Sequence, residues 1–359
     1  MVLQLSSSEF KNSPEILSKT NFKQMHLRLD KEGFFIKAIK DKSLTKHGIQ
    51  ALPLNKGTFL KDIRKSYQLW LMLLLPLLYI ILFKYVPMYG IQLAFKRFIG
   101  SKGIWGSPWV GLANIKRFTD SYFFPRVMKN TIGINLYQLA AGFPLPIILA
   151  IALNSTRSTV YRKTVQLSTY LPHFISTVVM VGMLMQFLSP RNGILAKIVT
   201  MLGGAPVNYI GVPAYFKSIY VWSGIWQNTG WGTIVYLAAL AAIDSTLHEA
   251  AIVDGANRFQ RIIHIDIPGI LPTAIILLIL RTGRMMGVGF EKVYLLQNNL
   301  NTPTSEVIST YVYKVGLGGE GVADFSFATA IGLFNSIISI ALLSTVNQIS
   351  KKVTENSLW

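Results

Sequence analysis

The sequence contains no cysteine and few charged residues. Without cysteine there are no disulfide bonds and no metal centres with thiolate ligands, and the five histidines show no ligand spacing. Charged residues make up 14% of the 359 residues and hydrophobic residues 51%, whereas a typical soluble domain has about 25% charged residues. These proportions indicate a membrane protein, and no metal site is predicted.

The sequence also lacks the motifs of nucleotide-hydrolysing and nucleophilic enzymes. No Gly-x-x-x-x-Gly-Lys-[Ser/Thr] segment is present to hold nucleotide phosphates. The glycine-rich segments 283–287 and 316–319 have no following lysine, so they are predicted to be turn and helix-packing residues. No nucleophile elbow is present. We therefore expect neither catalytic residues nor a cofactor bound by this chain.

Positive charge is in large excess, with a formal net charge of +19. Such an excess is typical of nucleic-acid-binding proteins, but several apolar runs of about 20 residues argue against nucleic acid as a partner. Basic residues at the cytoplasmic ends of membrane spans and near lipid headgroups account for the charge. We expect contacts with membrane lipid.

Six apolar segments are predicted to span the membrane, which gives an all-α protein with both termini in the cytoplasm. Basic residues before the first segment favour a cytoplasmic N-terminus. Residues 1–66, with 13 Lys/Arg and 6 Asp/Glu, are predicted to be a cytoplasmic arm that is either disordered or interfacial, and residues 351–359 a cytoplasmic tail. The membrane domain covers residues 67–350, with spans at about 69–86, 130–153, 167–188, 215–243, 270–289 and 327–349.

A polar insert at residues 244–268 separates the fourth and fifth spans. It contains Glu249-Ala-Ala-Ile-Val-Asp-Gly-Ala256 and ends at Pro268. Gly255 tolerates left-handed backbone conformations, so it is predicted to separate two short helices. The insert is too polar to cross a membrane and too apolar for a free loop. It is therefore predicted to bind a partner.

The insert resembles the EAA motif of permease subunits of binding-protein-dependent ABC importers. It reads Glu-Ala-Ala, two residues, Asp-Gly-Ala, eight residues and Ile-x-(Leu)-Pro, with Ile267 in place of the usual leucine. Segments 86–95, 106–112, 170–174 and 230–240 are similar to the carbohydrate-importer branch, in particular to importers of alginate and pectin fragments. The resemblance covers about residues 67–359 and leaves out residues 1–66.

The resemblance implies a type I ABC importer permease fold, with six transmembrane helices and a cytoplasmic coupling-helix insert, in the bacterial cytoplasmic (inner) membrane. It implies a second homologous permease subunit, two ATP-binding cassette subunits that hold ATP and magnesium, an extracytoplasmic solute-binding protein and an oligosaccharide substrate. The residues expected to couple to the ATPase are Glu249, Ala250, Ala251, Asp254, Gly255, Ala256, Arg258 and Arg261.

Polar residues within the spans are predicted to line the substrate path. Arg281 lies about 16 Å along a helix from Ile270, near the middle of a hydrocarbon core of about 30 Å. An arginine at that depth is expected to face a wet cavity, or to form an ion pair with another span or with the second permease. Two arginines are compatible with an acidic sugar, and aromatic and amide groups suit sugar rings and hydroxyls. The predicted path residues are Trp226, Gln227, Asn228, Trp231, Tyr236, Arg281, Arg284 and Asn335.

Two other classes of protein are alternatives. An ion-coupled secondary transporter needs an acidic residue within the spans and commonly has inverted repeats. No acidic residue lies well inside a predicted span, which argues against this class. A membrane assembly protein that transports nothing has no need of arginines at mid-depth.

Overall fold

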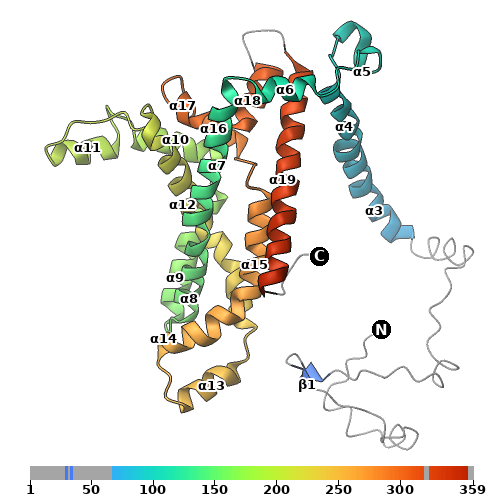
Figure 1. Cartoon of the computed structure of the whole chain (residues 1–359). Coiled ribbons are helices and arrows are strands. Elements are labelled where there is room, and N and C mark those ends of the chain that lie inside the picture. The colour runs from blue at the N-terminus through green and yellow to red at the C-terminus, as the bar shows by residue number, and fades with distance from the viewer. Residues whose placement is uncertain (1–28, 31–32, 35–66, 319–322, 355–359) are drawn as a thin grey trace, which may run out of the picture. The chain divides into compact units, whose positions relative to one another are not determined.

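The computed structural model describes residues 29–30, 33–34, 67–318 and 323–354, which are almost entirely helical (Figure 1). Strands β1 (Leu29–Asp30) and β2 (Gly33–Phe34) form one antiparallel pair. The rest of the predicted arm, and the tail beyond residue 354, lie outside the described residues. The chain divides into two compact units, residues 1–79 and residues 80–359.

Helix α3 (Tyr67–Ile80), which begins in the first unit, is apolar on every side. None of its side chains is buried, and Leu71, Met72 and Leu75 are 68%, 72% and 73% exposed. A helix with no polar face is suited to lipid rather than water.

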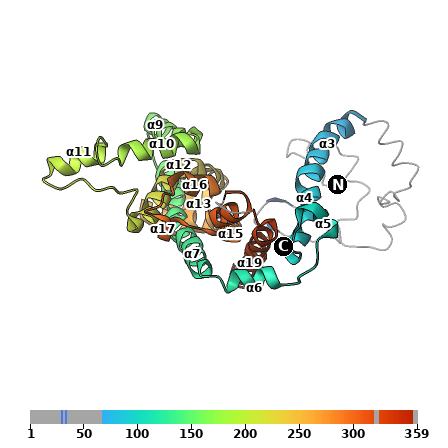
Figure 2. The ribbon, with the colours of Figure 1, turned by 90° about the horizontal axis from the view of Figure 1, so that it is seen from above.

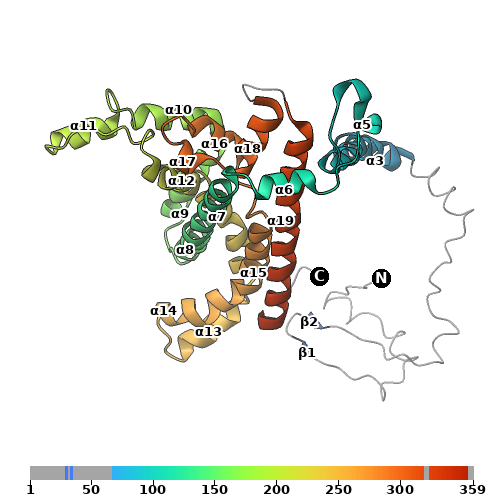
Figure 3. The same cartoon turned by 45° about the horizontal axis from the view of Figure 1, so that its top comes forward.

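The second unit is a bundle of long helices with short helices at both ends (Figures 1 and 3). Its elements, in chain order, are η4 (Ile81–Tyr85), α4 (Val86–Met88), η5 (Tyr89–Phe95), η6 (Gly100–Lys102), α5 (Gly103–Gly106), α6 (Ala113–Thr119), α7 (Phe123–Gly142), α8 (Pro144–Asn154), α9 (Thr159–Tyr170), η7 (Leu171–Phe174), α10 (Thr177–Phe187), α11 (Ile194–Met201), α12 (Pro213–Ala241), α13 (Ser245–Val253), α14 (Arg258–Arg261), η8 (Ile262–Asp266), α15 (Ile267–Gly283), α16 (Phe290–Leu296), α17 (Thr302–Ser305), α18 (Ile308–Tyr313), η9 (Lys314–Gly318) and α19 (Phe325–Thr354).

Helix α12 is the centre of this bundle, because α7, α8, α9 and α15 all pack against it. One apolar core joins α7, α12 and α16 through the fully buried Ile134, Val221 and Val293. Another joins α8, α12 and α15 and includes Ala150 and Ile270. Helix α19 packs on α15, α6 and α18, whereas α11 extends away from the bundle (Figures 1 and 2). Burial of these apolar side chains is the main force that holds the helices together.

Four helices in the described part of the chain are long and apolar enough to cross a membrane. They are Tyr67–Phe95, Phe123–Asn154, Arg258–Gly283 and Phe325–Lys352. Two further pairs pass the same test only together: Thr159–Phe174 with Thr177–Phe187, bent by 101°, and Pro213–Ala241 with Ser245–Val253, bent by 69°. The structure therefore has four such helices, or up to six if each bent pair is one span.

The third predicted span, 167–188, is not a straight helix in the structure. Pro172 has no backbone N–H to continue α9. Ser176 then starts a new helix, since its hydroxyl oxygen accepts a hydrogen bond from the N–H of Val179 at 3.3 Å. The chain turns by 101° between these two helices.

The fifth predicted span, 270–289, is displaced toward the N-terminus. The helix begins at Arg258, inside the polar insert, and ends at Gly283, so residues 284–289 lie beyond it. It passes Pro268 because the preceding turn, η8, is a wide π turn in which the N–H of Ile267 bonds to the carbonyl of Ile262. Pro268 therefore does not begin a separate helix.

The contact between α9 and α12 generates a test of the packing. A Cβ atom at Gly230 would overlap the backbone of Thr169, which cannot move away as a flexible side-chain end can. We expect Gly230→Ala to destabilise the protein by about 1–3 kcal/mol, a typical cost of overpacking. The measurement is the midpoint of thermal unfolding of the purified protein in detergent. The matched control is Gly182→Ala, because a Cβ there meets nothing within 4 Å. An equal midpoint for both variants would contradict the packing.

Candidate functional site

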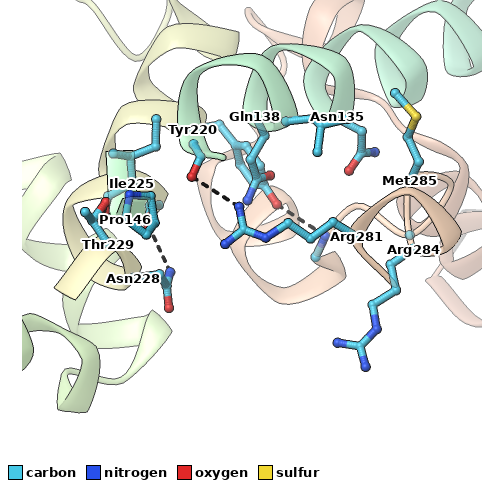
Figure 4. A pocket seen from close by; sticks show the side chains of 15 residues that line it. Asn135, Gln138, Pro146, Tyr220, Ile225, Asn228, Thr229, Arg281, Arg284 and Met285 are labelled. Atoms are coloured by element: carbon cyan, nitrogen blue, oxygen red, sulfur yellow. Dashed lines mark hydrogen bonds between the residues drawn. The ribbon is translucent and has the colours of Figure 1, made fainter. Parts of the chain in front are cut away.

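A cavity of about 390 Å³ lies within the second unit, between α7, α12 and the C-terminal end of α15 (Figure 4). Its wall is a mixture of polar residues, apolar residues and glycines. The lining residues are Asn135, Gln138, Leu139, Gly142, Pro146, Tyr220, Gly224, Ile225, Asn228, Thr229, Arg281, Arg284, Met285, Gly287 and Gly289.

Helix α12 forms one wall of the cavity with residues four apart. Tyr220, Gly224 and Asn228 recur at this spacing and therefore share a face of the helix. The amide nitrogen of Asn228 donates to the carbonyl of Gly224 at 2.9 Å, which fixes the side chain against the wall. The Tyr220 hydroxyl accepts a hydrogen bond from the N–H of Gly289 at 3.2 Å. The loop after α15 is thereby held on α12.

Arg281 extends across the cavity, whereas Arg284 points in a different direction (Figure 4). A guanidinium nitrogen of Arg281 donates to the carbonyl of Gly142 at 3.1 Å, and its guanidinium carbon lies 5.7 Å from the centre of the Phe143 ring. Phe143 joins α7 to α8, near the middle of a 32-residue helical segment. Arg281 therefore reaches the junction of α7 and α8. It lies in the last turn of its own helix, whereas the sequence predicts a place near the middle of a span.

The cavity has positive charge and no matching negative charge. Within the part of the chain that the structure describes, neither Arg281 nor Arg284 lies within 4.0 Å of a carboxylate oxygen. The described residues also contain no group of three or more His, Asp or Glu side chains that could hold a metal ion. The remaining polar lining consists of amides and hydroxyls. This chemistry suits an anionic ligand that carries hydroxyl groups.

The other predicted path residues lie elsewhere. The Trp231 ring stacks on His173 with centroids 4.6 Å apart, and the Gln227 amide donates to the carbonyl of Ile175 at 2.8 Å. Together with the contact of His173 with Asn228 at 3.1 Å, these interactions brace the bend between α9 and α10. These side-chain contacts stabilise the backbone between α9 and α10, where the hydrogen bonds of a continuous α-helix are interrupted.

The structure also places three further predicted residues outside the cavity lining. Trp226 is half exposed on the surface of α12, Tyr236 is buried in the core with Ala150, and Asn335 is partly buried in α19. Of the eight predicted path residues, Asn228, Arg281 and Arg284 line the cavity.

Sequence reasoning did not identify Asn135, Gln138 or Tyr220. The first two are polar residues three apart in an apolar span, and this spacing is the signal that could have indicated a common face. Tyr220 carries no such signal, because its contact with Gly289 joins distant parts of the chain.

The polar insert lies at the opposite end of the bundle from α6, α17 and α18 (Figures 1 and 3). Asp244 caps α13 by accepting from the N–H of Thr246 at 3.0 Å, and this bond keeps the pKa of the Asp244 carboxyl below its usual value. Gly255 then reverses the chain with φ of 79°. Asn257 and Gln260 form a reciprocal capping box, with bonds of 2.8 and 2.9 Å, that starts the next helix.

The predicted helix, turn and helix are therefore present, but the second helix continues into α15. His248 on α13 lies 3.4 Å from a carboxylate oxygen of the buried Asp266 on η8, so the two arms of the insert are held together. The predicted coupling residues fall into two groups: Glu249, Ala250, Asp254, Gly255 and Arg258 are exposed, and Ala251, Ala256 and Arg261 are partly buried.

Comparison with known proteins identifies the family to which the chain is similar. Residues 142–355 match the family described as "Binding-protein-dependent transport system inner membrane component". The chain is 39% identical over 315 residues to protein LplB of Bacillus subtilis (strain 168), and the match covers 88% of this chain and 98% of that protein. It is 40% identical over 305 residues to the polygalacturonan/rhamnogalacturonan transport system permease protein YteP of the same strain, covering 85% of this chain and 94% of that protein.

Solved structures with the same fold include a bacterial alginate ABC transporter in complex with an alginate pentasaccharide-bound periplasmic protein. The TM-score is 0.75 at 38% identity, over 83% of this chain and 99% of that chain. A second structure, of a bacterial ABC transporter involved in the import of the acidic polysaccharide alginate, gives 0.75 at 39% identity. The predicted resemblance and the type I permease fold are confirmed. The chain belongs to the family of binding-protein-dependent transport system inner membrane components, and it is an integral membrane permease subunit of an ABC transporter.

Proposed function

We propose that this permease imports an oligosaccharide with carboxylate groups and that the cavity holds the sugar during its passage. The observation that carries the proposal is the cavity itself, with Arg281 and Arg284 in its lining and no carboxylate of the described residues beside them. An arginine inside a membrane costs about 2.5–3.5 kcal/mol, so a functional reason for it is expected. The similarity to a polygalacturonan/rhamnogalacturonan permease and to two alginate transporters supports an acidic substrate.

The polar insert is the proposed contact with the ATPase. Its tip carries the large apolar side chains Ile252, Val253 and Phe259, which are 56%, 86% and 69% exposed. Exposed apolar side chains next to the carboxylates of Glu249 and Asp254 suit a protein partner, because such a patch in water favours association. The insert end of the bundle then faces the cytoplasm, and both termini of the chain are cytoplasmic in the bacterial inner membrane.

A continuous helix connects the proposed ATPase contact to the cavity. It begins at Arg258 in the insert and ends at Gly283, beside Arg281. At about 1.5 Å per residue, these 26 residues span about 39 Å. Motion of the insert when the ATPases close would move the cavity wall as well, which gives alternating access. Such a shift requires contacts with the ATPase that differ between the two states.

The complete importer in this proposal contains partners that supply what this chain lacks. A second homologous permease forms the other half of the path. Two ATP-binding cassette subunits hold ATP and magnesium, and an extracytoplasmic solute-binding protein delivers the sugar to the opposite end of the bundle. The similar alginate transporter is in complex with a periplasmic protein that carries an alginate pentasaccharide, which supports a binding protein for this permease as well.

The role of Arg281 is tested by replacement with methionine, which keeps the length of the chain and removes the charge. We expect Arg281→Met to lower uptake of trigalacturonate by at least about tenfold, because a hydrogen bond to a charged group contributes about 1.5–3 kcal/mol. Uptake is measured in proteoliposomes that contain the assembled importer. The control is Arg157→Met, an exposed arginine between α8 and α9. Equal uptake by the two variants would refute the assignment.

The coupling role of the insert is tested with Glu249→Lys and Gly255→Val. The first reverses an exposed charge, and the second places a branched side chain at φ of 79°, where such side chains are strained. We expect ATP hydrolysis to persist while uptake falls to the background level. Glu249→Gln, which keeps the shape of the side chain, serves as the conservative comparison. Normal transport by Glu249→Lys at normal membrane levels would disprove this coupling contact.

A further inference from the structure

The ammonium group of Lys292 is buried directly behind the α12 wall of the cavity. Lys292 lies on α16, outside the helices that could span the membrane, and is 9% exposed. Its Nζ donates to the backbone carbonyl of Tyr220 at 2.7 Å and lies 4.6 Å from the centre of the Tyr220 ring. Among the described residues, no carboxylate oxygen lies within 4.0 Å of it. It is a buried cation without an ion-pair partner in this part of the chain.

The wall between Lys292 and the cavity is thin because it contains a glycine. A Cβ atom at Gly224 would lie 3.1 Å from Lys292 Nζ, and Gly224 itself lines the cavity. No side chain at position 224 separates the ammonium group from a ligand in the cavity. A charge buried behind so thin a wall is screened less by water than a charge on the surface.

The protonation of Lys292 depends on its burial and on the charged groups around it. Burial lowers the pKa of the Lys292 ammonium from its usual value to about 7. Helix α10, which packs on α16, carries no titratable side chain. Titratable groups lie on the other adjoining elements. They are Tyr215, Lys217, Tyr220 and Tyr236 on α12, Tyr311 and Tyr313 on α18, Glu291 and Tyr294 on α16 itself, and Arg284 in the preceding loop.

We propose that Lys292 sets the preference of the cavity for carboxylate-bearing sugars, and that it takes up a proton from solvent when an acidic sugar enters beside Gly224. This inference rests on the proposed transport of acidic oligosaccharides. A bound carboxylate stabilises the ammonium form of the lysine over the neutral amine. By linkage, the protonated protein binds the carboxylate more tightly by the same factor. The preference for acidic sugar therefore falls as the pH rises through about 7.

The experiment compares two probes in proteoliposomes that contain the assembled importer. Trigalacturonate is the acidic probe, and its carboxyl-reduced form, trigalactose, is the neutral probe. The measured quantity is the ratio of their apparent affinities between pH 6 and pH 8.5. We expect this ratio to fall by about tenfold across that range for the unaltered protein, since the lysine is charged at pH 6 and neutral at pH 8.5 and a contact with a charged group is worth about tenfold or more.

Two substitutions at Lys292 distinguish the effect of its positive charge from the effect of its loss of a proton with rising pH. Lys292→Met is expected to give a low ratio at every pH. Lys292→Arg keeps its charge throughout the range, so its ratio is expected to stay high and independent of pH. The matched control is Lys197→Met, an exposed lysine on α11, which is expected to retain the unaltered pH profile.

A second position tests the thin wall if substitutions at Lys292 impair folding. Gly224→Ala adds a methyl group between the ammonium and the cavity, and the flexible end of the lysine can shift to admit it. We expect a reduced ratio with a shallower pH dependence. If Lys292→Met or Gly224→Ala retained both the ratio and the pH profile, the role of Lys292 would be refuted. If the unaltered importer moved no trigalacturonate at all, the proposed function itself would fail.

Discussion

The continuous helix from Arg258 to Gly283 is the constraint on which the rest of this structure depends. One end of this helix belongs to the polar insert and the other end carries Arg281 into the cavity. The insert and one wall of the cavity therefore belong to a single helix. The core that joins α15 to α8 and α12 holds this helix in the bundle and also positions the opposite wall of the cavity.

The cavity combines elements that satisfy different requirements. A carbonyl and an aromatic ring stabilise the Arg281 guanidinium, and the junction of α7 and α8 supplies both through Gly142 and Phe143. Tyr220 is held at its hydroxyl by Gly289 and at its carbonyl by Lys292. The wall is therefore fixed before a ligand arrives, which reduces the entropy that binding must overcome.

The sequence was sufficient to predict much of the fold, because hydropathy depends only on residues close together in the chain. The long apolar segments and the polar insert, with Gly255 at its turn, were found in this way. The break between α12 and α13 was also predicted, at the start of the insert, but the bend between α9 and α10 was not, since it depends in part on contacts with α12. Arg281 was identified because a charge in an apolar segment is conspicuous. Lys292 was not identified, because its burial arises from residues about 70 positions away in the sequence.

The π turn at Ile262–Asp266 has a consequence for the geometry of the whole helix. A π turn holds one more residue than the corresponding α turn, and each residue of an α-helix rotates the following side chains by about 100°. The angle around the helix axis between the insert residues and the Arg281 side chain is thus fixed by the number of residues in this one turn. Removal of a single residue from that turn would leave both ends of the helix intact but rotate one relative to the other by about 100° around the helix axis.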